Sequence, residues 1–352
     1  MSVEAQARFG PLRPVPPAGV VHALGGDGSP WRADRLGSDG PFPNGGMWRV
    51  LQPGTPAASA VVKRTGPAHL GGDPVWAGAV DSADPQWWGR EAVFYRSDLA
   101  TVGWTDGCRA ARCLAIDDHD DLRDLWLEDV VDLPLPSQEY RRLVGALATW
   151  QVHHRGVDRP WLSHGWIPAH VRRRGLDNDR TLGDARWSRM FEAGIPASVH
   201  DDVRHRLTDP TTIGRVVDEL PQLLTHYDFH HMNLGRVAGE TVIIDWATVG
   251  LGPVGHDVGV LLLDQATTLR EALPEQWEQL VTTYAEALGD AGSRISVAEV
   301  ERSVAISTAL RHGWVIDYVL GLSDKLSLEE LAPLSTVLVH LGTLQSRYPL
   351  PE

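Results

Sequence analysis

Short apolar runs separated by polar turns fill the first third of the chain. Five of these runs have the length and composition of β-strands and lie at 31–36, 47–50, 59–63, 111–116 and 125–130. Between the third and fourth runs, residues 85–99 carry apolar side chains at helical spacing. The pattern predicts a small, mostly antiparallel sheet that carries one helix. Residues 1–30 are rich in proline and glycine, so we expect an irregular arm there.

The pattern changes to a helical period after the break Leu133-Pro134-Leu135-Pro136. Apolar residues then recur every three or four positions and predict helices at 137–153, 209–219, 277–288, 296–322 and 328–344. Ser137, Asp209 and Ser296 precede three of these helices and are the expected N-caps. Ser296 also forms a capping-box pattern with Glu299.

A predicted hairpin interrupts the helical part of the chain. The loop HYDFHHMN begins at His226, and the second hairpin strand, Thr241–Ile244, ends at Asp245. The whole pattern predicts an α+β protein with two lobes. A sheet lobe spans residues 31–132, and a larger, mainly helical lobe spans residues 133–352.

Length and charge restrict the classes of function. The 352 residues suffice for two lobes, and we expect a monomer or a homodimer. The formal net charge of −14 argues against nucleic acid as a partner, since a phosphate backbone needs a basic face, and it is compatible with a cationic small molecule. No apolar run has the length of a membrane span and no signal peptide is recognisable, so we expect no membrane partner and a cytoplasmic location. Cys108 and Cys113 are the only cysteines, which excludes a disulfide framework.

The densest group of polar side chains lies at residues 226–257. Asp228, in the predicted loop, is the candidate catalytic base. Asn233 and Asp245 offer a neutral and a charged oxygen ligand, the kind that Mg²⁺ accepts, and are the candidate metal ligands. Phosphoryl transfer needs these groups together with positive charge on the donor phosphates.

The numbers of arginines and lysines indicate which residue supplies that positive charge. The chain has thirty arginines but only two lysines, and Lys63 ends a predicted strand. The connection GSDGPFPNGG joins the first two predicted strands and includes Gly45 and Gly46, and glycines let backbone amides approach an anion closely. We therefore predict that Lys63 and this loop bind the phosphates of a nucleotide, and that Glu91 on the predicted helix orients Lys63.

HYDFHHMN followed by VIIDW resembles the HxDxxxxN and terminal-Asp motifs of the aminoglycoside phosphotransferase family, a branch of the protein-kinase-like fold. The resemblance covers residues 31–260, where VVK with Glu91 is similar to the ion pair of the family's N-lobe. The family has His-Gly-Asp in its catalytic loop, whereas this chain has Tyr227 in the middle position. The resemblance implies a two-lobed kinase-like fold, with ATP or GTP and Mg²⁺ as cofactors.

The same resemblance implies roles for further residues. LWLEDV looks like the last N-lobe strand and the hinge, which implies adenine contacts through the backbone around Glu128, Asp129 and Val130. His226 and Asp257 match residues that support the catalytic loop in the family.

The acceptor implied by the resemblance is a hydroxyl of a small molecule, such as an aminoglycoside, another antibiotic or an amino sugar. Candidate acceptor contacts lie in the C-terminal helices, because carboxylates bind ammonium groups and aromatic rings stack on sugars; they are Asp264, Trp314, Asp317 and Tyr318. One alternative is a kinase-like protein that binds nucleotide without transferring phosphate. Another is a zinc-dependent hydrolase that uses the His226–His231 cluster, although the order HxDxHH differs from the HxHxDH of two-zinc hydrolases.

Overall fold

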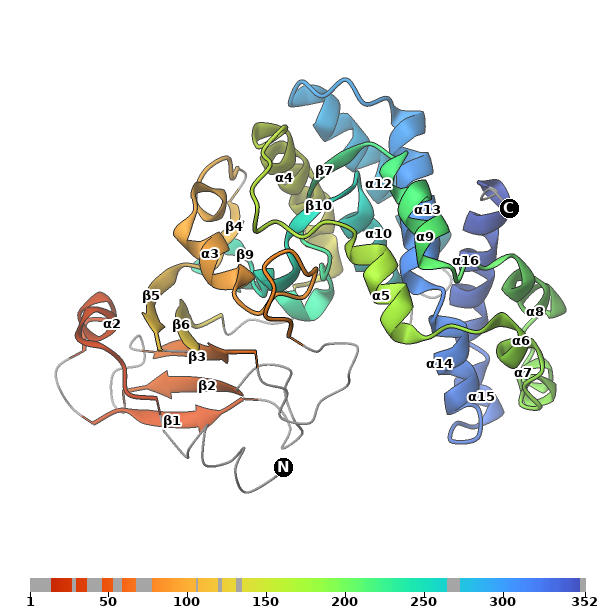
Figure 1. Cartoon of the computed structure of the whole chain (residues 1–352), viewed down its shortest axis with the longest axis horizontal. Coiled ribbons are helices and arrows are strands. Elements are labelled where there is room, and N and C mark those ends of the chain that lie inside the picture. Colours follow the sequence, from red (N-terminus) through yellow and green to blue (C-terminus); the bar gives the residue numbers. More distant parts are fainter. Residues whose placement is uncertain are drawn as a thin grey trace.

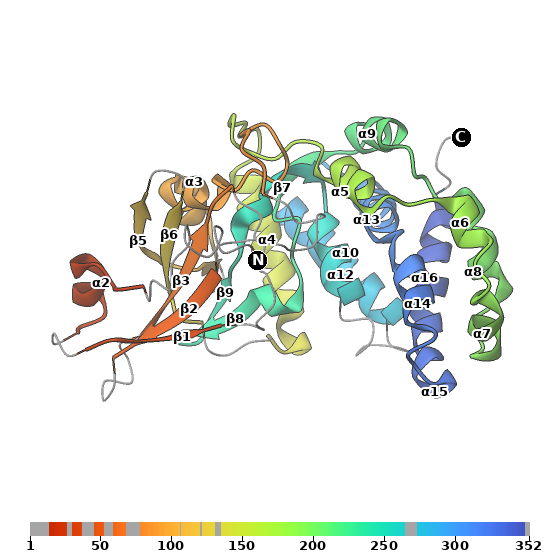
Figure 2. The ribbon, with the colours of Figure 1, turned by 60° about the horizontal axis from the view of Figure 1, so that its bottom comes forward.

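The computed structural model describes most of the chain, namely residues 14–26, 30–36, 46–52, 59–67, 78–105, 107–119, 122–130, 135–264 and 273–348. A strand-rich N-terminal region and a helical C-terminal region lie side by side (Figure 1). A view turned by 60° shows the same separation (Figure 2). The predicted α+β architecture is confirmed, whereas the division at residue 133 stays a prediction.

The N-terminal region is built on one five-stranded sheet with the order β1-β2-β3-β6-β5. Its strands are β1 (Arg32–Arg35), β2 (Gly46–Leu51), β3 (Ser59–Thr65), β5 (Cys113–Asp118) and β6 (Arg123–Glu128). Every neighbouring pair is antiparallel. All five predicted strands are therefore present, within a few residues of their expected ends.

The two faces of this sheet are covered by different helices. On one face, Val62 and Trp126 pack with Val20 of helix α2 (Ala18–Ala23). That helix lies within the segment that we expected to be an irregular arm, and the burial of Val20 explains why the chain is ordered there. On the other face, Ala92 of helix α3 (Arg90–Arg96) packs on Leu125 of β6. Because strand residues alternate between faces, Lys63 lies on the same face as Leu125, towards α3.

A second, three-stranded sheet connects the two regions. Its strands are β4 (Cys108–Ala110), β8 (Leu234–Val237) and β9 (Glu240–Ile243), and β9 lies in the middle. The hairpin β8–β9 was predicted, but β4 and its parallel pairing with β9 were not. A further antiparallel pair joins β7 (Gln222–Thr225) to β10 (Gly250–Pro253), and the loop that begins at His226 leaves the end of β7.

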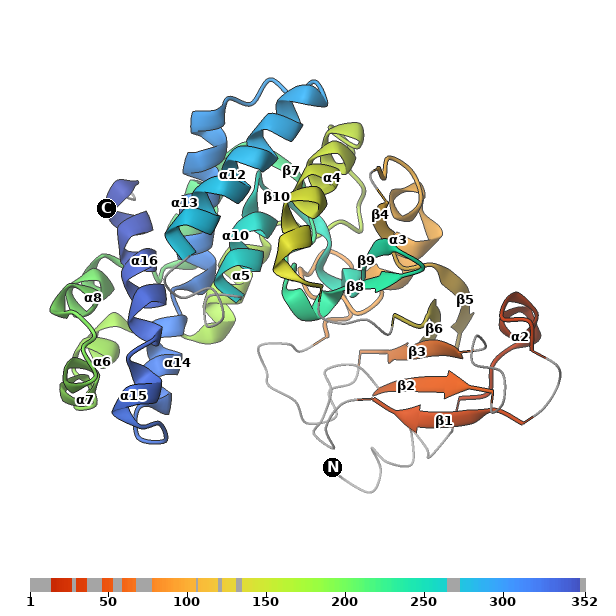
Figure 3. The same ribbon diagram turned by 180° about the vertical axis from the view of Figure 1, so that it is seen from behind.

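In the helical region, five helices supply buried residues to the largest apolar core; Figure 3 shows this region from behind. These five helices are α4 (Tyr140–His153), α10 (His256–Asp264), α12 (Leu273–Asp290), α13 (Val297–His312) and α16 (Leu334–Arg347). The remaining helices lie around them: α5 (Trp166–Arg174), α6 (Asn178–Leu182), α7 (Trp187–Glu192), α8 (Ala197–Asp202), α9 (Pro210–Asp218), α14 (Val315–Leu322) and α15 (Leu328–Leu331). Short 3₁₀ turns occur at Asp98–Ala100, Ser137–Glu139, Val203–His205, His231–Asn233 and Trp246–Thr248. Within the described ranges, no helix has both the length and the apolar character needed to cross a bilayer.

The predicted helix caps have mixed outcomes. The Asp209 side chain accepts the N–H of Thr212, and Ser296 and Glu299 form the reciprocal capping box. Ser137 was wrongly expected to cap a helix, because it is itself the first residue of a 3₁₀ turn and no side chain caps that turn.

The predicted ends of three helices also need correction. The helix expected at 296–322 ends at His312, and a new helix starts at Val315 beyond Gly313. The helix expected at 328–344 is divided before Leu334, since Pro333 lacks the N–H that a continuous helix needs. In contrast, α12 continues through Gly289, where we expected it to stop.

Candidate active site

A buried lysine joins the five-stranded sheet to the end of the hairpin. Lys63 Nζ lies 2.6 Å from Glu91 Oε2 and 2.6 Å from Asp245 Oδ1. The side chains of Lys63 and Glu91 are buried, whereas that of Asp245 is 37% exposed. Burial opposes the charge on Lys63, but the two carboxylates outweigh it and raise the pKa of the ammonium above its ordinary value. Lys63 is therefore a permanent cation at this site.

Three separate elements bring these side chains together. Lys63 comes from β3, Glu91 from the first turn of α3, and Asp245 follows β9 with a left-handed φ of 62°. The backbone N–H of Trp246 donates to Glu91 Oε1 at 3.3 Å, and the Trp246 ring stacks on Phe94 of α3 at 4.3 Å between centroids. These contacts fix α3 against the segment that carries Asp245.

Asp228 lies in the loop between β7 and the 3₁₀ turn His231–Asn233. Burial disfavours its charge, but the hydrogen bond from His230 and the positive charges around it lower the pKa of the carboxyl to about 2. Its side chain is 24% exposed and lines a cavity. Asp228 is therefore an ionised carboxylate that faces accessible space.

Two buried side chains hold the backbone around Asp228. The Asp257 carboxylate accepts the N–H groups of His226 at 2.9 Å and Tyr227 at 3.0 Å. The His226 ring lies 3.0 Å from the carbonyl of Ile244 through Nε2, and its Nδ1 accepts the N–H of Asp228 at 3.3 Å. The structure thus places His226 and Asp257 where the resemblance implied loop-supporting residues.

Tyr227 adopts a backbone conformation that favours glycine. Its φ is 68°, in the left-handed region that a side chain disfavours. The ring is buried and stacks on Trp166 at 5.1 Å, and the hydroxyl donates to the carbonyl of Leu251 at 2.6 Å. Gly252 makes room for it, because a Cβ there would lie 2.4 Å from the Tyr227 hydroxyl. The loop therefore keeps a glycine-like backbone although it carries a tyrosine.

Asn233 is oriented towards the same loop. Its Nδ2 donates to the carbonyl of Asp228 at 2.8 Å, which leaves Oδ1 as the acceptor of the amide. The carbonyl of Asn233 accepts the N–H of Ile244 at 3.0 Å, so Asn233 and the segment that leads into Asp245 meet at the same end of the hairpin. An amide oxygen and a half-exposed carboxylate are donors that suit Mg²⁺.

The histidines of the loop have different environments. Ligand atoms of His230, His231 and Asp264 lie within 4.8 Å of one another, so this group could hold a metal ion. His231 Nδ1 contacts Asp264 Oδ2, and His230 Nε2 lies 3.4 Å from Asp228 Oδ2. Both ring nitrogens of His226 make hydrogen bonds, so a zinc site that includes His226 is not formed.

The residues predicted to bind the nucleotide are only partly described. Gly45 lies outside the described residues, and Gly46 starts β2 with a φ of 132° that favours glycine. The Glu128 carboxylate is buried and contacts Arg109 and Arg112. Asp129 pairs with Arg49 at 2.8 Å, and Val130 is buried. The side chains of Glu128 and Asp129 are therefore engaged within the protein, which is compatible with a contribution through backbone groups.

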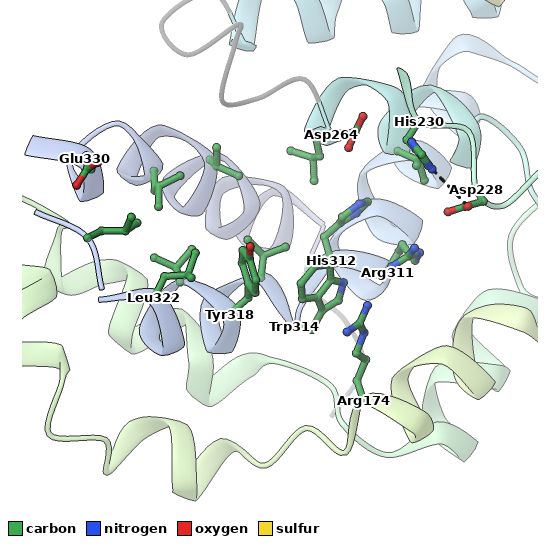
Figure 4. Close-up of a pocket in the computed structure, with 17 residues that line it drawn as sticks. Arg174, Asp228, His230, Asp264, Arg311, His312, Trp314, Tyr318, Leu322 and Glu330 are labelled. Carbon is green, nitrogen blue, oxygen red and sulfur yellow. Dashed lines mark ion pairs between the residues drawn. The ribbon is translucent and has the colours of Figure 1, made fainter. Parts of the chain in front are cut away.

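A cavity of about 610 Å³ opens beside Asp228, between the catalytic loop and the C-terminal helices (Figure 4). Asp264, Trp314 and Tyr318 line it, and their contact with an acceptor stays a prediction. Asp317 does not line it, because its carboxylate lies 2.5 Å from both Arg206 Nη1 and Thr181 Oγ1. The expectation that Asp317 faces the acceptor is therefore wrong.

Several cavity residues were missed from the sequence. Arg174 of α5 and Arg311 and His312 of α13 line the cavity together with Asp228. Their positions in the sequence carry no motif, and only the packing of α5 against α13 brings Arg174 and Arg311 to one wall. The sequence gives only a weak signal for Arg311, which follows a run of apolar and small residues in the helix predicted at 296–322.

Comparison with known sequences identifies a family. The sequence model of the phosphotransferase enzyme family matches residues 105–294, which is more than half of the chain. The match includes Asp228, Asn233, Asp245 and Asp257. No curated protein sequence matches this chain.

Comparison with solved structures identifies similar folds. An amicoumacin kinase in complex with AMP-PNP and Ca²⁺ shares 12% identity and a TM-score of 0.51, and the alignment covers 91% of this chain and 90% of that chain. An aminoglycoside phosphotransferase in complex with ADP and hygromycin B shares 13% identity and a TM-score of 0.44, with 92% and 97% covered. A choline/ethanolamine kinase family protein from Mesorhizobium loti shares 16% identity and a TM-score of 0.48, with 97% and 94% covered. The first likeness supports the predicted kinase-like fold.

Proposed function

This chain belongs to the phosphotransferase enzyme family, and on that premise we propose that it transfers the terminal phosphoryl group of ATP, or GTP, to a hydroxyl of a small molecule with the help of Mg²⁺. That it is a small-molecule phosphotransferase follows from the family. The donor, the metal, the acceptor and the role of each residue are parts of the proposal.

The arrangement of two carboxylates around one ammonium carries this proposal. Glu91 is completely buried and is a permanent partner of Lys63, whereas Asp245 is 37% exposed. An ammonium has three donors, of which the two carboxylates take two. The third can reach a phosphate oxygen, and the exposed Asp245 can share its charge with a bound cation. A purely structural ion pair has no need of the second, exposed carboxylate.

On the donor side, Lys63 holds the phosphates and Glu91 keeps the ammonium in place. Gly45 and Gly46 approach the phosphates through their backbone, and the backbone around Glu128, Asp129 and Val130 contacts the adenine. Asn233 Oδ1 and the Asp245 carboxylate are the ligands of Mg²⁺ in this proposal. The ion, when bound, neutralises phosphate charge that builds up during transfer.

Asp228 orients the acceptor hydroxyl towards the phosphorus atom. The bond from the phosphorus to the bridging oxygen of the nucleotide breaks, a new bond to the acceptor oxygen forms, and the hydroxyl proton passes to Asp228. A carboxylate with a pKa of about 2 is a weak base. It is adequate because the transition state of phosphoryl transfer is loose and positioning contributes most of the catalysis.

The acceptor is expected among aminoglycosides, other antibiotics and amino sugars. The cavity beside Asp228 supports an acceptor of small-molecule size, because ligand sites of this kind measure roughly 300–1,000 Å³. Asp264, Trp314 and Tyr318 are positioned to contact such a molecule.

A screen of ATP consumption and phosphorylated product tests the function. The acceptors are aminoglycosides, amino sugars, nucleoside antibiotics and choline-like alcohols, each with Mg²⁺ and with a chelator. We expect a product that requires both nucleotide and Mg²⁺. Lys63→Met is expected to reduce its formation by roughly 100-fold or more, because a preorganised cation at the phosphates is lost. Lys325→Met is the matched control, since Lys325 is the other lysine of the chain and is exposed.

Two outcomes would contradict the proposal. Hydrolysis that depends on Zn²⁺ and not on nucleotide would favour a hydrolase at His230, His231 and Asp264. Nucleotide binding without consumption across all acceptors would favour a binding protein. Circular dichroism of the folded Lys63→Met variant separates loss of activity from loss of structure.

A further inference from the structure

The cavity beside Asp228 has polar side chains at its two ends and an apolar wall between them. Asp228, Arg311 and Arg174 lie at one end, and the wall then continues along Tyr318 and Leu322 to Glu330 (Figure 4). Between the ends, most of the wall is aliphatic, with Val260, Leu263, Val319, Leu322, Leu334 and Val337 among its residues. This long apolar wall matches an apolar body and offers few partners to a molecule that carries many amino and hydroxyl groups.

The acidic groups of the cavity already have partners. Asp264 contacts His231, and its carboxylate also accepts the N–H of His231 at 3.0 Å. Glu330 accepts the N–H of Ser327 at 2.7 Å in a capping box at the exposed start of α15. Asp228 is the proposed catalytic group. Of the described carboxylates that line the cavity, Asp264 and Glu330 thus have partners within the protein and Asp228 has the proposed catalytic role, so these three do not form a free acidic cluster for a polycation.

The guanidinium of Arg311 differs from these acids. Its side chain is buried, its Nη1 lies 2.7 Å from His170 Nε2, and its plane covers the Trp166 ring at 4.7 Å. Burial and the neighbouring cations lower the pKa of His170, so that ring is neutral and accepts from Arg311. Nε of Arg311 is buried without a hydrogen-bond partner, and among the described residues no carboxylate forms an ion pair with Arg311.

A buried cation without an opposite charge in direct contact is expensive, unless a ligand supplies that contact. Arg174 lies on the same wall, with its guanidinium 4.1 Å from the centre of the Trp314 ring. The two guanidinium groups share His170, since Arg174 Nε lies 3.4 Å from the same Nε2. Asp228 is near enough to Arg311 for each charge to act on the other, so an anion bound here lies next to the reacting hydroxyl.

We propose, resting on the function given above, that the acceptor is a hydroxy acid with an apolar body: its hydroxyl lies at Asp228, its carboxylate at Arg311 and Arg174, and its apolar part along α10, α14 and α16. A guanidinium fork suits a carboxylate because two parallel N–H groups meet its two oxygens. This narrows the acceptor class and disfavours a polycationic aminoglycoside.

Binding to the full chain without nucleotide tests this proposal independently of phosphoryl transfer. The probe is β-hydroxydecanoate, measured by isothermal titration calorimetry against three relatives. Its methyl ester removes the negative charge, β-hydroxybutyrate removes the apolar body, and kanamycin represents a polycation. We expect the hydroxy acid to bind roughly 10-fold or more tightly than each of the other three, because only it has both features.

Variants locate the two halves of the site. Arg311→Met is expected to weaken binding of β-hydroxydecanoate by roughly 30-fold and to leave the ester within a few-fold, since only the acid loses its counter-charge. Arg174→Met should act in the same direction, and its half-buried side chain makes this variant independent of any folding defect at Arg311. Leu322→Asn should weaken the acid and the ester alike. The control is Arg294→Met, an exposed arginine on the loop before α13.

The outcomes distinguish the two proposals. Three results would overturn the hydroxy-acid acceptor. Kanamycin or the ester could bind at least as tightly as the acid, or the acid could show no measurable binding. The third result is an acid affinity that is unchanged in both folded arginine variants. If the acid also receives phosphate from ATP, both proposals gain support. Phosphorylation of an aminoglycoside without binding of the acid would overturn this inference and leave the phosphotransferase function intact. Acid binding without ATP consumption by any acceptor would contradict the phosphotransferase function alone.

Discussion

Asp257 shows how a single buried residue shapes the catalytic loop. Its two carboxylate oxygens each accept one backbone N–H, from His226 and from Tyr227, immediately before Asp228. The burial of this carboxyl raises its pKa to about 7, although both hydrogen bonds favour the charged form. Asp257 therefore titrates near neutral pH while it supports the loop.

Replacing Asp257 should reveal this titration. Asp257→Asn puts an amide N–H against a backbone N–H, which leaves a buried donor unpaired and costs about 1–3 kcal/mol of unfolding free energy. In the parent, folding raises the pKa from 3.8 to about 7, so the folded protein binds more protons than the unfolded chain between these values. The stability that Asp257 contributes is therefore fully present below the unfolded pKa of 3.8 and is lost as the pH rises through the folded pKa of about 7.

Urea unfolding of both proteins measures this effect, because Asn does not titrate. The difference in unfolding free energy between parent and Asp257→Asn should shrink as the pH rises from about 5 to about 8. A difference that grows over this range would show that the folded state prefers the ionised carboxyl.

Tyr227 and Gly252 form a pair that can be tested by a double-mutant cycle. Tyr227→Gly removes left-handed strain of about 1–2 kcal/mol but also removes a buried aromatic ring, whose loss costs about 3–5 kcal/mol. We expect a net loss of about 2–3 kcal/mol of unfolding free energy, with turnover retained by the folded protein because glycine keeps the same backbone.

The second half of the cycle uses Gly252→Ala. The added Cβ would meet the Tyr227 hydroxyl at 2.4 Å. Gly252→Ala should therefore destabilise the parent protein much more than it destabilises the Tyr227→Gly variant. Additive effects in chemical unfolding would show that the two positions are not in contact.

Residue identity alone predicted part of the site, and packing decided the rest. Lys63 was found because lysine is rare in this chain, and its contacts with Glu91 and Asp245 agree with that choice. Asp317 was wrongly expected to face the cavity. Tyr318 and Leu322 share the face of α14 that lines the cavity, whereas Asp317 is rotated by about 100° about the helix axis and points towards Arg206. Arg311 could not be found from the sequence, because its proposed role depends on the three-dimensional finding that no described carboxylate forms an ion pair with it.

At the scale of elements, local signals predicted structure better than long-range pairing did. Capping residues at Asp209 and Ser296 fixed two helix starts, because their bonds involve neighbours in sequence. The parallel pairing of β4 with β9 places Arg109 opposite Val242, far along the chain, and leaves no periodic trace in either segment. The end of α13 at His312 was not predicted either, and it places Arg311 in the last turn of that helix.

The capping box of α13 gives a prediction at this scale. Ser296→Ala removes the acceptor of the Glu299 N–H and should lower the unfolding free energy by about 1 kcal/mol. Turnover should not change, because the cap lies at the opposite end of α13 from Arg311. Ser296→Thr, which keeps a hydroxyl, is the control. Loss of turnover without loss of stability would contradict this separation.

At the scale of the whole molecule, one cluster links parts that are far apart in sequence. Lys63 comes from the N-terminal sheet and Asp245 from the hairpin of the helical region, 182 positions later. The family resemblance predicted the pair of Lys63 with Glu91, but the contact of Lys63 with Asp245 was not predicted, since neither residue indicates its partner in the sequence. The position of the donor between the two regions stays part of the proposal.

Nucleotide binding should therefore stabilise the whole molecule. Mg²⁺ with ATP at 100 times its dissociation constant should add about 2.7 kcal/mol of stability, visible as a rise in Tm. Asp245→Asn should reduce this rise in Tm, because a charged metal ligand is lost. A smaller rise in Tm, caused by ATP alone in the absence of Mg²⁺, should remain in this variant. Asp290→Asn, an exposed residue at the end of α12, is the control. An undiminished rise in Asp245→Asn would remove Asp245 from the metal site.

In the proposed mechanism, Asp228 directs a hydroxyl at a phosphate donor bound beside Lys63. The most direct test is the initial rate of phosphorylated-acceptor formation in Asp228→Asn, with Tm measured with and without Mg²⁺ and ATP on the same samples. We predict a rate lower by roughly 100-fold to 10,000-fold, with the rise in Tm retained, because Asp228 acts on the acceptor and not on the donor. A variant that keeps the full rate would contradict the account.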